Sequence, residues 1–461
     1  MMKKTDYLSL LFLFIAGIFS LNAQVNLSVN VSEGRHTITP YLNGAHFVYG
    51  AEQDNLYKDE RIADWMRRAK VKAIRWPGGT AVMTYHWDAL TGDNFGPDRW
   101  DTVNYVEKNI PAFEYMDLDE YIAYCRKVDA EPMVGVNIKS GRQYRTDAEG
   151  LDEARRLIQY CKDKNFGVKL WYIGNEGYAK GFSPEMYAKY IDMYAEVLKE
   201  VDPDITIIGD WKFGPEVKNR FEESMTIIKL SKHLDIMEYH EKWGNEWGLA
   251  GGRTLEEWKS EFPLYNGKFD YYCKEFFERV KLMGKHTKLA FNEWGVGGNL
   301  GGTAHNYALL VADYMLLMMR HDIYSACYWN MNMGQGSKDN RVFTTKSKGA
   351  ELEKFNPVAK VFELTASALE TTYLELKSTD KRVYGVATFD EKNKELQLYL
   401  LNKTCENQLV KLSLAGAKVK GKMHFNSFDE SGNEMQQTIR YNRDGFTLPA
   451  YSFSKIVFNM K

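Results

Sequence analysis

Residues 169–177 read Lys-Leu-Trp-Tyr-Ile-Gly-Asn-Glu-Gly, and residues 288–295 read Lys-Leu-Ala-Phe-Asn-Glu-Trp-Gly. Each stretch is a short apolar run, typical of a buried strand, that ends in an Asn-Glu pair. Strands that are apolar on both faces are typical of parallel sheets covered by helices. The two stretches therefore predict parallel strands that deliver Glu176 and Glu293 to their carboxyl ends.

The same order of apolar strand, polar loop and amphipathic helix repeats on both sides of these stretches. Alternating strands and helices imply parallel pairing through right-handed crossovers, and eight such units make an α/β fold of the (β/α)8, or TIM, barrel type. An open doubly wound sheet is disfavoured because no Gly-rich phosphate loop follows the first strand. The predicted strands are Tyr41–Val48, Val71–Trp76, Glu131–Ile138, Val168–Gly174, Ile205–Trp211, Leu234–His240, Lys288–Trp294 and Ile323–Trp329. The predicted helices include Leu118–Val128, Asp152–Lys162, Pro184–Val201, Asp270–Met283 and Asn306–His321.

The pattern changes after about Leu364, where apolar and polar residues alternate along short segments separated by turn residues. This alternation predicts a C-terminal antiparallel β-sandwich. Val25–Val31 alternates in the same way and is expected to join that sandwich. The predicted sandwich strands are Val383–Thr388, Glu395–Asn402, Gln408–Leu414, Met423–Phe428 and Phe446–Phe458. The expected divisions are 1–23 as a signal peptide, 24–37 as the joining strand, 38–364 as the barrel and 365–461 as the sandwich.

The N-terminal segment has the pattern of a secretory signal peptide. Two lysines precede the apolar run Leu8–Phe19, and a small residue, Ala23, follows it. About a dozen apolar residues are too few to span a bilayer, so cleavage is expected, with an uncleaved anchor as the alternative. A later apolar stretch, Tyr307–Met319, is interrupted by Asp313 and predicts a buried helix. The mature protein is therefore expected to be exported, to the periplasm or the outside of the cell, without a membrane anchor.

Composition excludes several other classes of function. The 60 basic and 62 acidic residues give a net charge of −2 without runs of like charge, so a nucleic-acid partner is not expected. The 5 cysteines are odd in number and widely spaced, which favours buried free thiols over a disulfide framework. The sequence has no His-x-x-x-His motif and no Cys/His cluster. No metal and no cofactor are expected, and no pattern indicates an oligomeric state.

Two carboxylates that face each other across a barrel mouth are what cleavage of a glycosidic bond requires. Functional groups of a barrel gather where its strands end. One carboxyl group must protonate the leaving oxygen, and the other must stay ionised to meet the anomeric carbon. Either glutamate alone would be interpreted as a solvated loop carboxylate, whereas the pair on strands four and seven favours catalysis. Glu246 repeats the Gly-Asn-Glu lettering but follows the polar pair Glu241-Lys242, so it is not expected to be catalytic.

Several further motifs occur in a particular order along residues 40–357. They are Ile74-Arg-Trp-Pro-Gly-Gly79, Tyr85-His-Trp87, Glu131-Pro-Met-Val-Gly-Val-Asn137, Trp171-Tyr-Ile-Gly-Asn-Glu176, Val201-Asp-Pro203, Asp235 to His240 and Phe291-Asn-Glu-Trp294. In this order the chain resembles the clan A retaining glycoside hydrolases, whose acid/base and nucleophile glutamates end strands four and seven. Within that clan it is most similar to the α-L-arabinofuranosidases of glycoside hydrolase family 51, whose layout also includes the C-terminal sandwich.

The resemblance implies roles for individual residues. Glu176 would be the acid/base and Glu293 the nucleophile, while Asn175 would hydrogen-bond the hydroxyl group next to the anomeric carbon. Arg75 would hold a sugar hydroxyl or orient the nucleophile. His240 would lie at the mouth of strand six, and Asn137 at the end of strand three.

The supporting residues also have structural alternatives. Arg75 could form an ion pair in the barrel floor, Asn137 could cap a loop, and His240 could be a hydrogen-bonded core histidine. Trp87, Trp294 and Trp329 could stack on sugar rings, although barrel packing explains each ring almost as well.

Three positions depart from the family pattern. Thr80 stands where the family has an Asn after Pro-Gly-Gly. The first strand, around residues 43–47, lacks the sugar-binding Glu of the family. Lys242 replaces the Tyr two positions after His240. These positions hold the arabinofuranose ring in the family, so the departures concern the sugar rather than the mechanism.

The sequence thus predicts a retaining glycoside hydrolase that acts on a polysaccharide or its oligosaccharides, with an α-L-arabinofuranoside as the first choice of substrate. The alternatives are an endo-acting or pyranoside-cleaving clan A glycosidase, similar to an agarase, galactanase or xylosidase, and a non-catalytic carbohydrate-binding barrel. The second alternative is disfavoured because both glutamates are present. An esterase or protease is disfavoured because there is no Gly-x-Ser-x-Gly motif.

Two further expectations concern the loops and the charges of the site. Long loops after strands two, three and six could line an open cleft or close a pocket, and their aromatic residues are Trp100, Tyr144, Trp243, Trp247 and Trp258. We expect the pKa of Glu176 to be raised by the nearby anion. We expect the pKa of Glu293 to be lowered by a donor such as Arg75.

Overall fold

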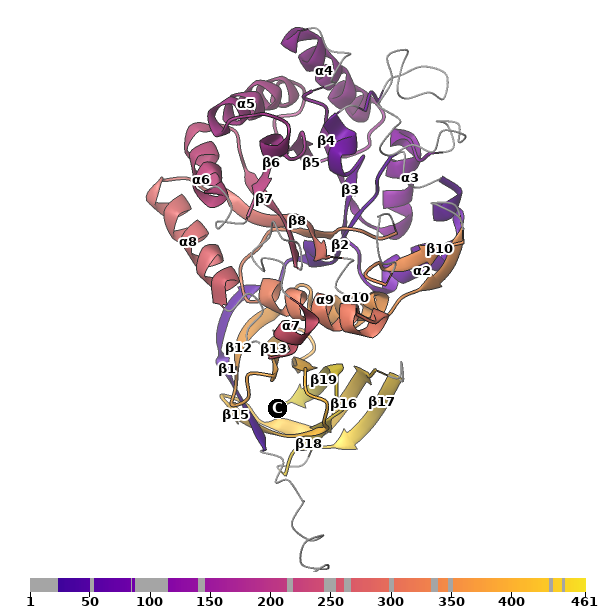
Figure 1. Cartoon of the computed structure of the whole chain (residues 1–461), viewed down its shortest axis with the longest axis vertical. Coiled ribbons are helices and arrows are strands. Elements are labelled where there is room, and N and C mark those ends of the chain that lie inside the picture. Colours follow the sequence, from indigo (N-terminus) through magenta and orange to yellow (C-terminus); the bar gives the residue numbers. More distant parts are fainter. Residues whose placement is uncertain are drawn as a thin grey trace, which may run out of the picture.

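A closed barrel of parallel strands, each followed by a segment on the outside, forms the larger part of the protein (Figure 1). The computed structural model describes residues 24–49, 54–83, 85–87, 115–139, 146–213, 219–243, 254–260, 267–297, 302–332, 339–346, 351–430, 434–441 and 444–461. The barrel strands are β2 (Gly44–His46), β3 (Ala73–Trp76), β4 (Glu131–Val136), β5 (Leu170–Ile173), β6 (Thr206–Lys212), β7 (Ile236–Trp243), β8 (Lys288–Val296) and β9 (Ala326–Tyr328). The predicted barrel is confirmed.

Two strands differ from their predicted bounds in ways that matter. The first is shorter because Pro40–Asn43 forms a 3-10 helix, with Thr39 as its N-cap and proline at its start. The sixth is longer, since β7 continues to Trp243. The expectation that Glu241 and Lys242 form a polar stretch outside a strand was therefore wrong.

The helices begin where the sequence supplies capping groups. In α3, Asp117 and Glu120 form a capping box, and in α5, Ser183 caps a helix that begins with Pro184. The helices that surround the barrel are α2 (Glu60–Arg68), α3 (Leu118–Val128), α4 (Asp147–Asp163), α5 (Pro184–Val201), α6 (Arg220–Leu230), α7 (Leu255–Ser260), α8 (Lys268–Leu282), α9 (Ala304–Met319) and α10 (Val358–Thr365).

Helix α9 is apolar all round because it is covered on both sides. It contacts β8 of the barrel and strands of the second domain, and Tyr307–Met319 is buried throughout. The buried helix predicted from this run, including Asp313, is therefore confirmed. Figure 1 shows α9 and α10 between the barrel and the C-terminal sheet. No helix within the described ranges combines the length and the apolar character needed to cross a membrane.

The second domain is built on one mostly antiparallel sheet with the order β17-β16-β19-β14-β13-β12-β1-β15-β18. Strand β1 (Val25–Thr37) lies between β12 and β15, and its pairing with β15 is parallel. The sequence analysis missed β12 and β17, and it merged β18 with β19. The other strands are β12 (Thr372–Ser378), β13 (Val383–Asp390), β14 (Glu395–Asn402), β15 (Gln408–Ala415), β16 (Val419–Phe428), β17 (Glu434–Arg440), β18 (Phe446–Leu448) and β19 (Ser452–Met460). A two-stranded sheet of β10 (Phe343–Thr345) and β11 (Leu352–Phe355) completes the fold.

Candidate active site

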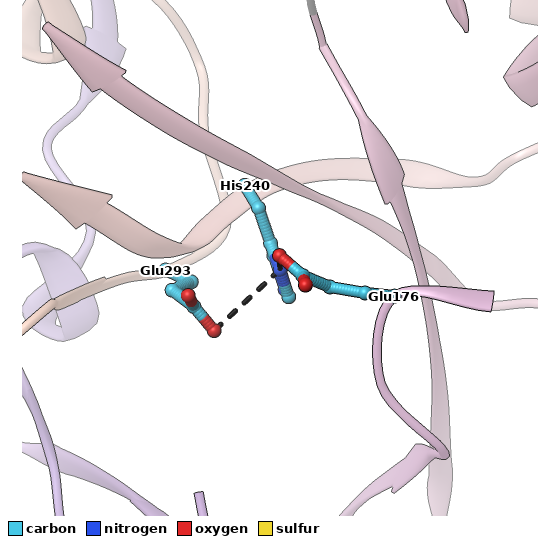
Figure 2. Close-up of side chains that lie close together, drawn as sticks. All are labelled: Glu176, His240 and Glu293. Atoms are coloured by element: carbon cyan, nitrogen blue, oxygen red, sulfur yellow. Dashed lines mark hydrogen bonds and ion pairs between the residues drawn. The ribbon is translucent and has the colours of Figure 1, made fainter. Parts of the chain in front are cut away.

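Glu176 and Glu293 meet at the carboxyl end of the barrel. Glu176 follows β5, and Glu293 lies in β8. One carboxylate oxygen of each lies within 4.8 Å of the other, and both oxygens lie within the same distance of a His240 ring nitrogen. Figure 2 shows both carboxylates directed toward this imidazole. The side chain of Glu176 is 27% exposed and that of Glu293 is 5% exposed, so only the first opens appreciably to solvent.

The backbone at Glu176 turns sharply to present its side chain. Gly174 has φ +71° and Glu176 has φ +50°, which is left-handed backbone that a glutamate seldom adopts. The Asp210 carboxylate at the end of β6 accepts the backbone N–H of Glu176. The Tyr187 hydroxyl of α5 donates to the other Asp210 oxygen at 2.7 Å. The neighbouring strand and helix therefore hold the turn in place.

Strand β7 lines the site with side chains two residues apart. Glu238, His240 and Lys242 share one face of the strand because side chains alternate along it. The His240 Nε2 lies 3.3 Å from a Glu238 oxygen, and its Nδ1 lies 3.1 Å from Glu176 and 3.5 Å from Glu293. The Lys242 ammonium donates to Glu293 Oε1 at 2.8 Å.

An irregularity in β8 aligns the nucleophile candidate with this face. Ala290 pairs with Glu238, but His240 pairs with Glu293, so β8 has one more residue than β7 over this interval. Adjacent residues of β8 consequently both contact β7: Asn292 donates to Glu238 at 2.7 Å, and Glu293 accepts from Lys242.

The His240 imidazole carries the proton that we expected on Glu176. Both of its nitrogens face carboxylates, which suits an imidazolium with two donors. Burial lowers the pKa of His240, but Glu293, Glu176, Glu238 and Asp210 outweigh burial and raise it to about 10. Burial and Glu293 raise the pKa of Glu176, whereas the hydrogen bond from His240 lowers it below its ordinary value overall. The expected raised pKa of Glu176 was therefore wrong, because His240 lies closer than the sequence could indicate.

Glu293 is ionised, as we expected from its surroundings. Burial acts to raise the pKa of Glu293, but the charges of Lys242 and His240, with a smaller contribution from Arg75, hold it well below its ordinary value. Lys242 and His240 contribute more than Arg75, although Arg75 was the donor named from the sequence. The lowered pKa of the nucleophile candidate is thus due mainly to β7.

Arg75 lies beneath the mouth in a buried ion pair. Its guanidinium donates to Glu238 at 2.8 Å and to Asn175 Oδ1 at 3.0 Å, and it lies over the Tyr172 ring. The distance from Arg75 to Glu293 Oε2 is 4.0 Å. Arg75 is completely buried, so its side chain does not reach the solvent-exposed mouth of the barrel. It positions Asn175 and places a positive charge beneath the two glutamates.

Asn137 and Trp87 lie close together, and the polar atoms of both side chains form hydrogen bonds with backbone groups. Asn137 donates to the carbonyl of Tyr85 at 3.1 Å and accepts from the N–H of Lys139 at 3.0 Å, as in the loop-capping alternative. The Trp87 indole donates to the carbonyl of Glu153 at 3.3 Å. Both side chains line a small cavity against α4.

The two remaining tryptophans occupy different environments. Trp294 is completely buried and packs against Tyr314, Tyr328 and Phe362, as in the barrel-packing alternative. Trp329 is partly exposed after β9, and the Lys242 ammonium lies 4.7 Å from the centre of its ring. Of the three predicted tryptophans, Trp329 is the one that lies against residues of the site, Lys242 and His46.

The sequence analysis did not single out Asp210, Glu238 or His46 as site residues. Asp210 and Glu238 are completely buried, and burial raises the pKa of Asp210 to about 6 although His240 opposes it. His46 donates from Nε2 to the carbonyl of Asn292, and burial lowers its pKa to about 3. Asp210 gave the same signal as Glu176, a carboxylate near the end of an apolar strand, whereas Glu238 lies inside β7 and gave no such signal.

In the part of the chain that the structure describes, the acidic and histidine side chains that could hold a metal ion together are Glu176, His240 and Glu293. The cationic His240 and Lys242 already lie against these carboxylates, and they would repel a metal ion.

Of the loop residues named above, Trp258 is completely buried. Trp100, Tyr144, Glu246 and Trp247 lie outside the described residues.

Residues 65–245 match the family model described as the alpha-L-arabinofuranosidase 1 domain. The matched segment includes Arg75, Asn175, Glu176 and His240, whereas Glu293 lies beyond it. An intracellular exo-alpha-(1->5)-L-arabinofuranosidase of Streptomyces lividans is 27% identical over 276 residues, which are 53% of this chain and 38% of that protein. A protein of the same description from Acetivibrio thermocellus is 22% identical over 53% of this chain and 50% of its own length. The chain thus spans half or less of the length of these curated relatives.

Solved structures share the whole architecture. The α-L-arabinofuranosidase of Thermotoga maritima superposes with a TM-score of 0.71 at 19% identity, covering 94% of this chain and 99% of the other. The GH51 α-L-arabinofuranosidase of Thermotoga petrophila gives 0.73 at 19% identity with the same coverage. A family 44 xyloglucanase of Paenibacillus polymyxa gives 0.64 at 15% identity, over 95% and 100%. The family model and the curated relatives confirm the resemblance to α-L-arabinofuranosidases. The solved structures establish the fold.

Proposed function

We propose that this protein is a retaining glycoside hydrolase. The observation that carries the proposal is that one oxygen of Glu176 and one oxygen of Glu293 lie within 4.8 Å of each other at the barrel mouth. Retaining glycosidases hold their two carboxyl groups about 5–5.5 Å apart, whereas inverting enzymes need about 6.5–9.5 Å to admit a water molecule. The close spacing favours direct attack by one carboxylate.

In the first step, Glu293 attacks the anomeric carbon while the bond from that carbon to the glycosidic oxygen breaks. The electron pair goes to the departing oxygen, which takes a proton from Glu176. In the second step, a water oxygen attacks the same carbon, its proton passes to Glu176, and the bond to Glu293 breaks with return of the electron pair. Glu176 thus acts first as an acid and then as a base.

The proton for the first step is shared between His240 and Glu176. In the free enzyme it resides on His240, since the pKa of His240 is raised and that of Glu176 is lowered. Transfer across their 3.1 Å contact leaves a neutral imidazole and a carboxylic acid, which is the form that a leaving oxygen requires. His240 is therefore proposed as a positioning residue that supplies Glu176 with its proton.

The proposed substrate is an α-L-arabinofuranoside at the end of a polysaccharide or oligosaccharide. The family model and the names of the relatives support this choice. Asn175 is proposed to bind the hydroxyl next to the anomeric carbon, and Trp329 to stack on a sugar ring. Asn137, Trp87 and Trp294 are not proposed as sugar contacts, because their environments have the structural explanations given above.

A panel of aryl glycosides tests the function. We expect hydrolysis of the α-L-arabinofuranoside, and loss of at least about 10³-fold in kcat for Glu293→Ala. Glu278→Ala, at an exposed glutamate of α8, is the matched control and should retain full activity. Faster cleavage of the β-xyloside or β-galactoside would replace the proposed sugar. Absence of activity on every glycoside, together with binding of polysaccharide, would favour the non-catalytic alternative.

We also propose that the protein is exported, on the strength of the lysines and the apolar run within residues 3–19. The two bacterial relatives described above are named as intracellular enzymes, so the proposal distinguishes this chain from them. Fractionation of the producing cell, with mass spectrometry of the N-terminus, tests it. A protein that begins near residue 24 in the exported fraction is the expected result, and full-length protein in the cytoplasm would contradict it.

A further inference from the structure

The two oxygens of Glu293 have different partners. Oε1 accepts a hydrogen bond from the Lys242 ammonium at 2.8 Å. Oε2 is buried and has no hydrogen-bond partner among the described residues, although His240 Nδ1 lies 3.5 Å and Arg75 Nη1 4.0 Å away. A carboxylate that is held through one oxygen can attack with the other. The asymmetry therefore distinguishes an anchored oxygen from a reacting one.

Lys242 is itself held in place. Its side chain is 25% exposed, and its ammonium lies 4.7 Å from the centre of the Trp329 ring, within the range of a cation–π contact. The other charged or titratable groups near Glu293 come from five elements: His46 from β2, Arg75 from β3, Tyr172 from β5, Glu176 and Tyr178 from the turn after β5, and Glu238 and His240 from β7. Among Lys242 and these other groups, Lys242 is the one that donates a hydrogen bond, of 2.8 Å, to the Glu293 carboxylate.

We propose that Lys242 positions the nucleophile by holding Oε1, so that Oε2 attacks the anomeric carbon, and that its ammonium promotes release of the sugar from Glu293 in the second step. This inference rests on the proposed function. It assigns to the lysine a role in one particular step. The sugar is joined to Oε2, and Oε1 becomes the carbonyl oxygen of the ester while it keeps its bond to Lys242.

The charge of Lys242 affects the two steps in opposite directions. In the first step Glu293 loses negative charge, so a neighbouring cation stabilises the starting state more than the transition state. In the second step negative charge returns to Glu293, and the cation stabilises the transition state more than the ester. Removal of the charge should therefore slow the second step selectively.

Lys242→Met removes both the charge and the donor, while Lys242→Gln keeps a neutral donor. With an activated aryl α-L-arabinofuranoside, whose leaving group makes the first step fast, we expect the second step to limit kcat. We expect Lys242→Met to lower kcat about 10²-fold, in line with the loss of one donor to a developing anion, and Lys242→Gln to lower it about 10-fold. KM should fall with kcat, so that kcat/KM changes by less than about 5-fold in either variant.

A rapid-mixing experiment on the same variants measures the aryl alcohol released in the first turnover. The variants should release close to one equivalent per protein in a burst before the slow steady state, and the covalent sugar adduct should appear in the intact mass. Lys169→Met, at an exposed lysine that binds Asp202, is the matched control and should behave as the parent. Thermal melting of each variant checks that it is folded.

Equal falls in kcat and kcat/KM without a burst would overturn the proposal, because a lysine that merely shapes the site would slow both steps alike. Unchanged kinetics in Lys242→Met would also overturn it. These outcomes are distinct from failure of the proposed function, in which the parent protein itself would cleave no glycoside or would release a sugar of inverted configuration.

Discussion

At the scale of single residues, Glu176 has two duties that substitution can separate. Glu176→Ala should leave the first step on an activated aryl glycoside nearly intact, because that leaving group needs no proton. The second step should slow about 10²–10⁴-fold without the base. Sodium azide, which attacks without a base, should restore turnover and yield a glycosyl azide of retained configuration. Rescue that is absent, or an azide product of inverted configuration, would remove Glu176 from this role.

The alkaline limit of activity should depend on His240. The pKa of His240 is raised to about 10, so the shared proton is retained well above neutral pH and is lost as the pH rises through that value. His240→Gln keeps a donor but cannot store the proton, so the alkaline limb of kcat/KM should move down by about 1 pH unit or more. The matched control is His233→Gln, at a partly exposed histidine near Glu196. An alkaline limb that does not move would contradict the shared proton.

The residue types at the strand ends identified Glu176 and Glu293 as candidate site residues, but they did not predict which charged groups surround them. Glu176 and Glu293 were recognisable because each ends an apolar run. Glu238 was not, because a carboxylate inside a strand gives no sign of its buried partner, Arg75, 163 residues away. The pKa of Glu176 was misjudged for the same reason, since the sign of the shift depends on the 3.1 Å contact with His240.

At the scale of secondary structure, β6 holds the turn that follows β5. Asp210→Asn keeps the shape of the side chain but places an amide where both partners donate, the Glu176 N–H and the Tyr187 hydroxyl. We expect kcat to fall about 10-fold and the free energy of unfolding to fall by about 1–3 kcal/mol. Kinetics and urea denaturation measure the two effects, with Asp204→Asn on the exposed turn before β6 as the control. Full activity in Asp210→Asn would show that the turn needs no such support.

Element bounds followed from capping residues and periodicity where these were strong. Helix α3 and helix α5 have the predicted bounds, because Asp117 and Ser183 mark their starts. Strand β17 was missed because its residues are mostly exposed and polar, so its position comes from pairing with β16 rather than from its own pattern. The length of β7 was misjudged because Glu241 and Lys242 are charged, although Glu293 of β8 supplies an ionic partner for Lys242.

At the scale of the whole molecule, a buried polar cluster joins the barrel to the C-terminal sheet. Asp313 of α9 accepts from the Trp258 indole of α7 at 2.7 Å and from the Tyr384 hydroxyl of β13. The Lys403 ammonium, from the turn after β14, donates to the carbonyl of Trp258 at 2.8 Å. Asp313→Asn should lower the free energy of unfolding by about 3–5 kcal/mol, since it removes the buried carboxylate whose charge stabilises the Lys403 ammonium.

The pH dependence of that loss has a definite sign. Burial lowers the pKa of Lys403 to about 8, and Asp313 opposes this effect, so Asp313→Asn should lower it further. A lysine whose folded pKa is depressed destabilises the protein at low pH, and the penalty diminishes as the pH rises. The difference in free energy of unfolding between variant and parent, measured by chemical denaturation, should therefore become smaller as the pH rises from about 6 to about 9. A difference that is constant with pH would exclude Lys403 as its source, and Asp64→Asn at an exposed ion pair should show no difference.

The central claim concerns the spacing of Glu176 and Glu293, and its most direct test is the configuration of the first product. Proton NMR can follow hydrolysis of the aryl glycoside that the protein cleaves fastest, before the released sugar equilibrates. The account predicts that the first sugar released has the same anomeric configuration as the substrate, which for an α-L-arabinofuranoside is the α anomer. First release of the opposite anomer would contradict direct attack by Glu293 and, with it, the assignment of the site.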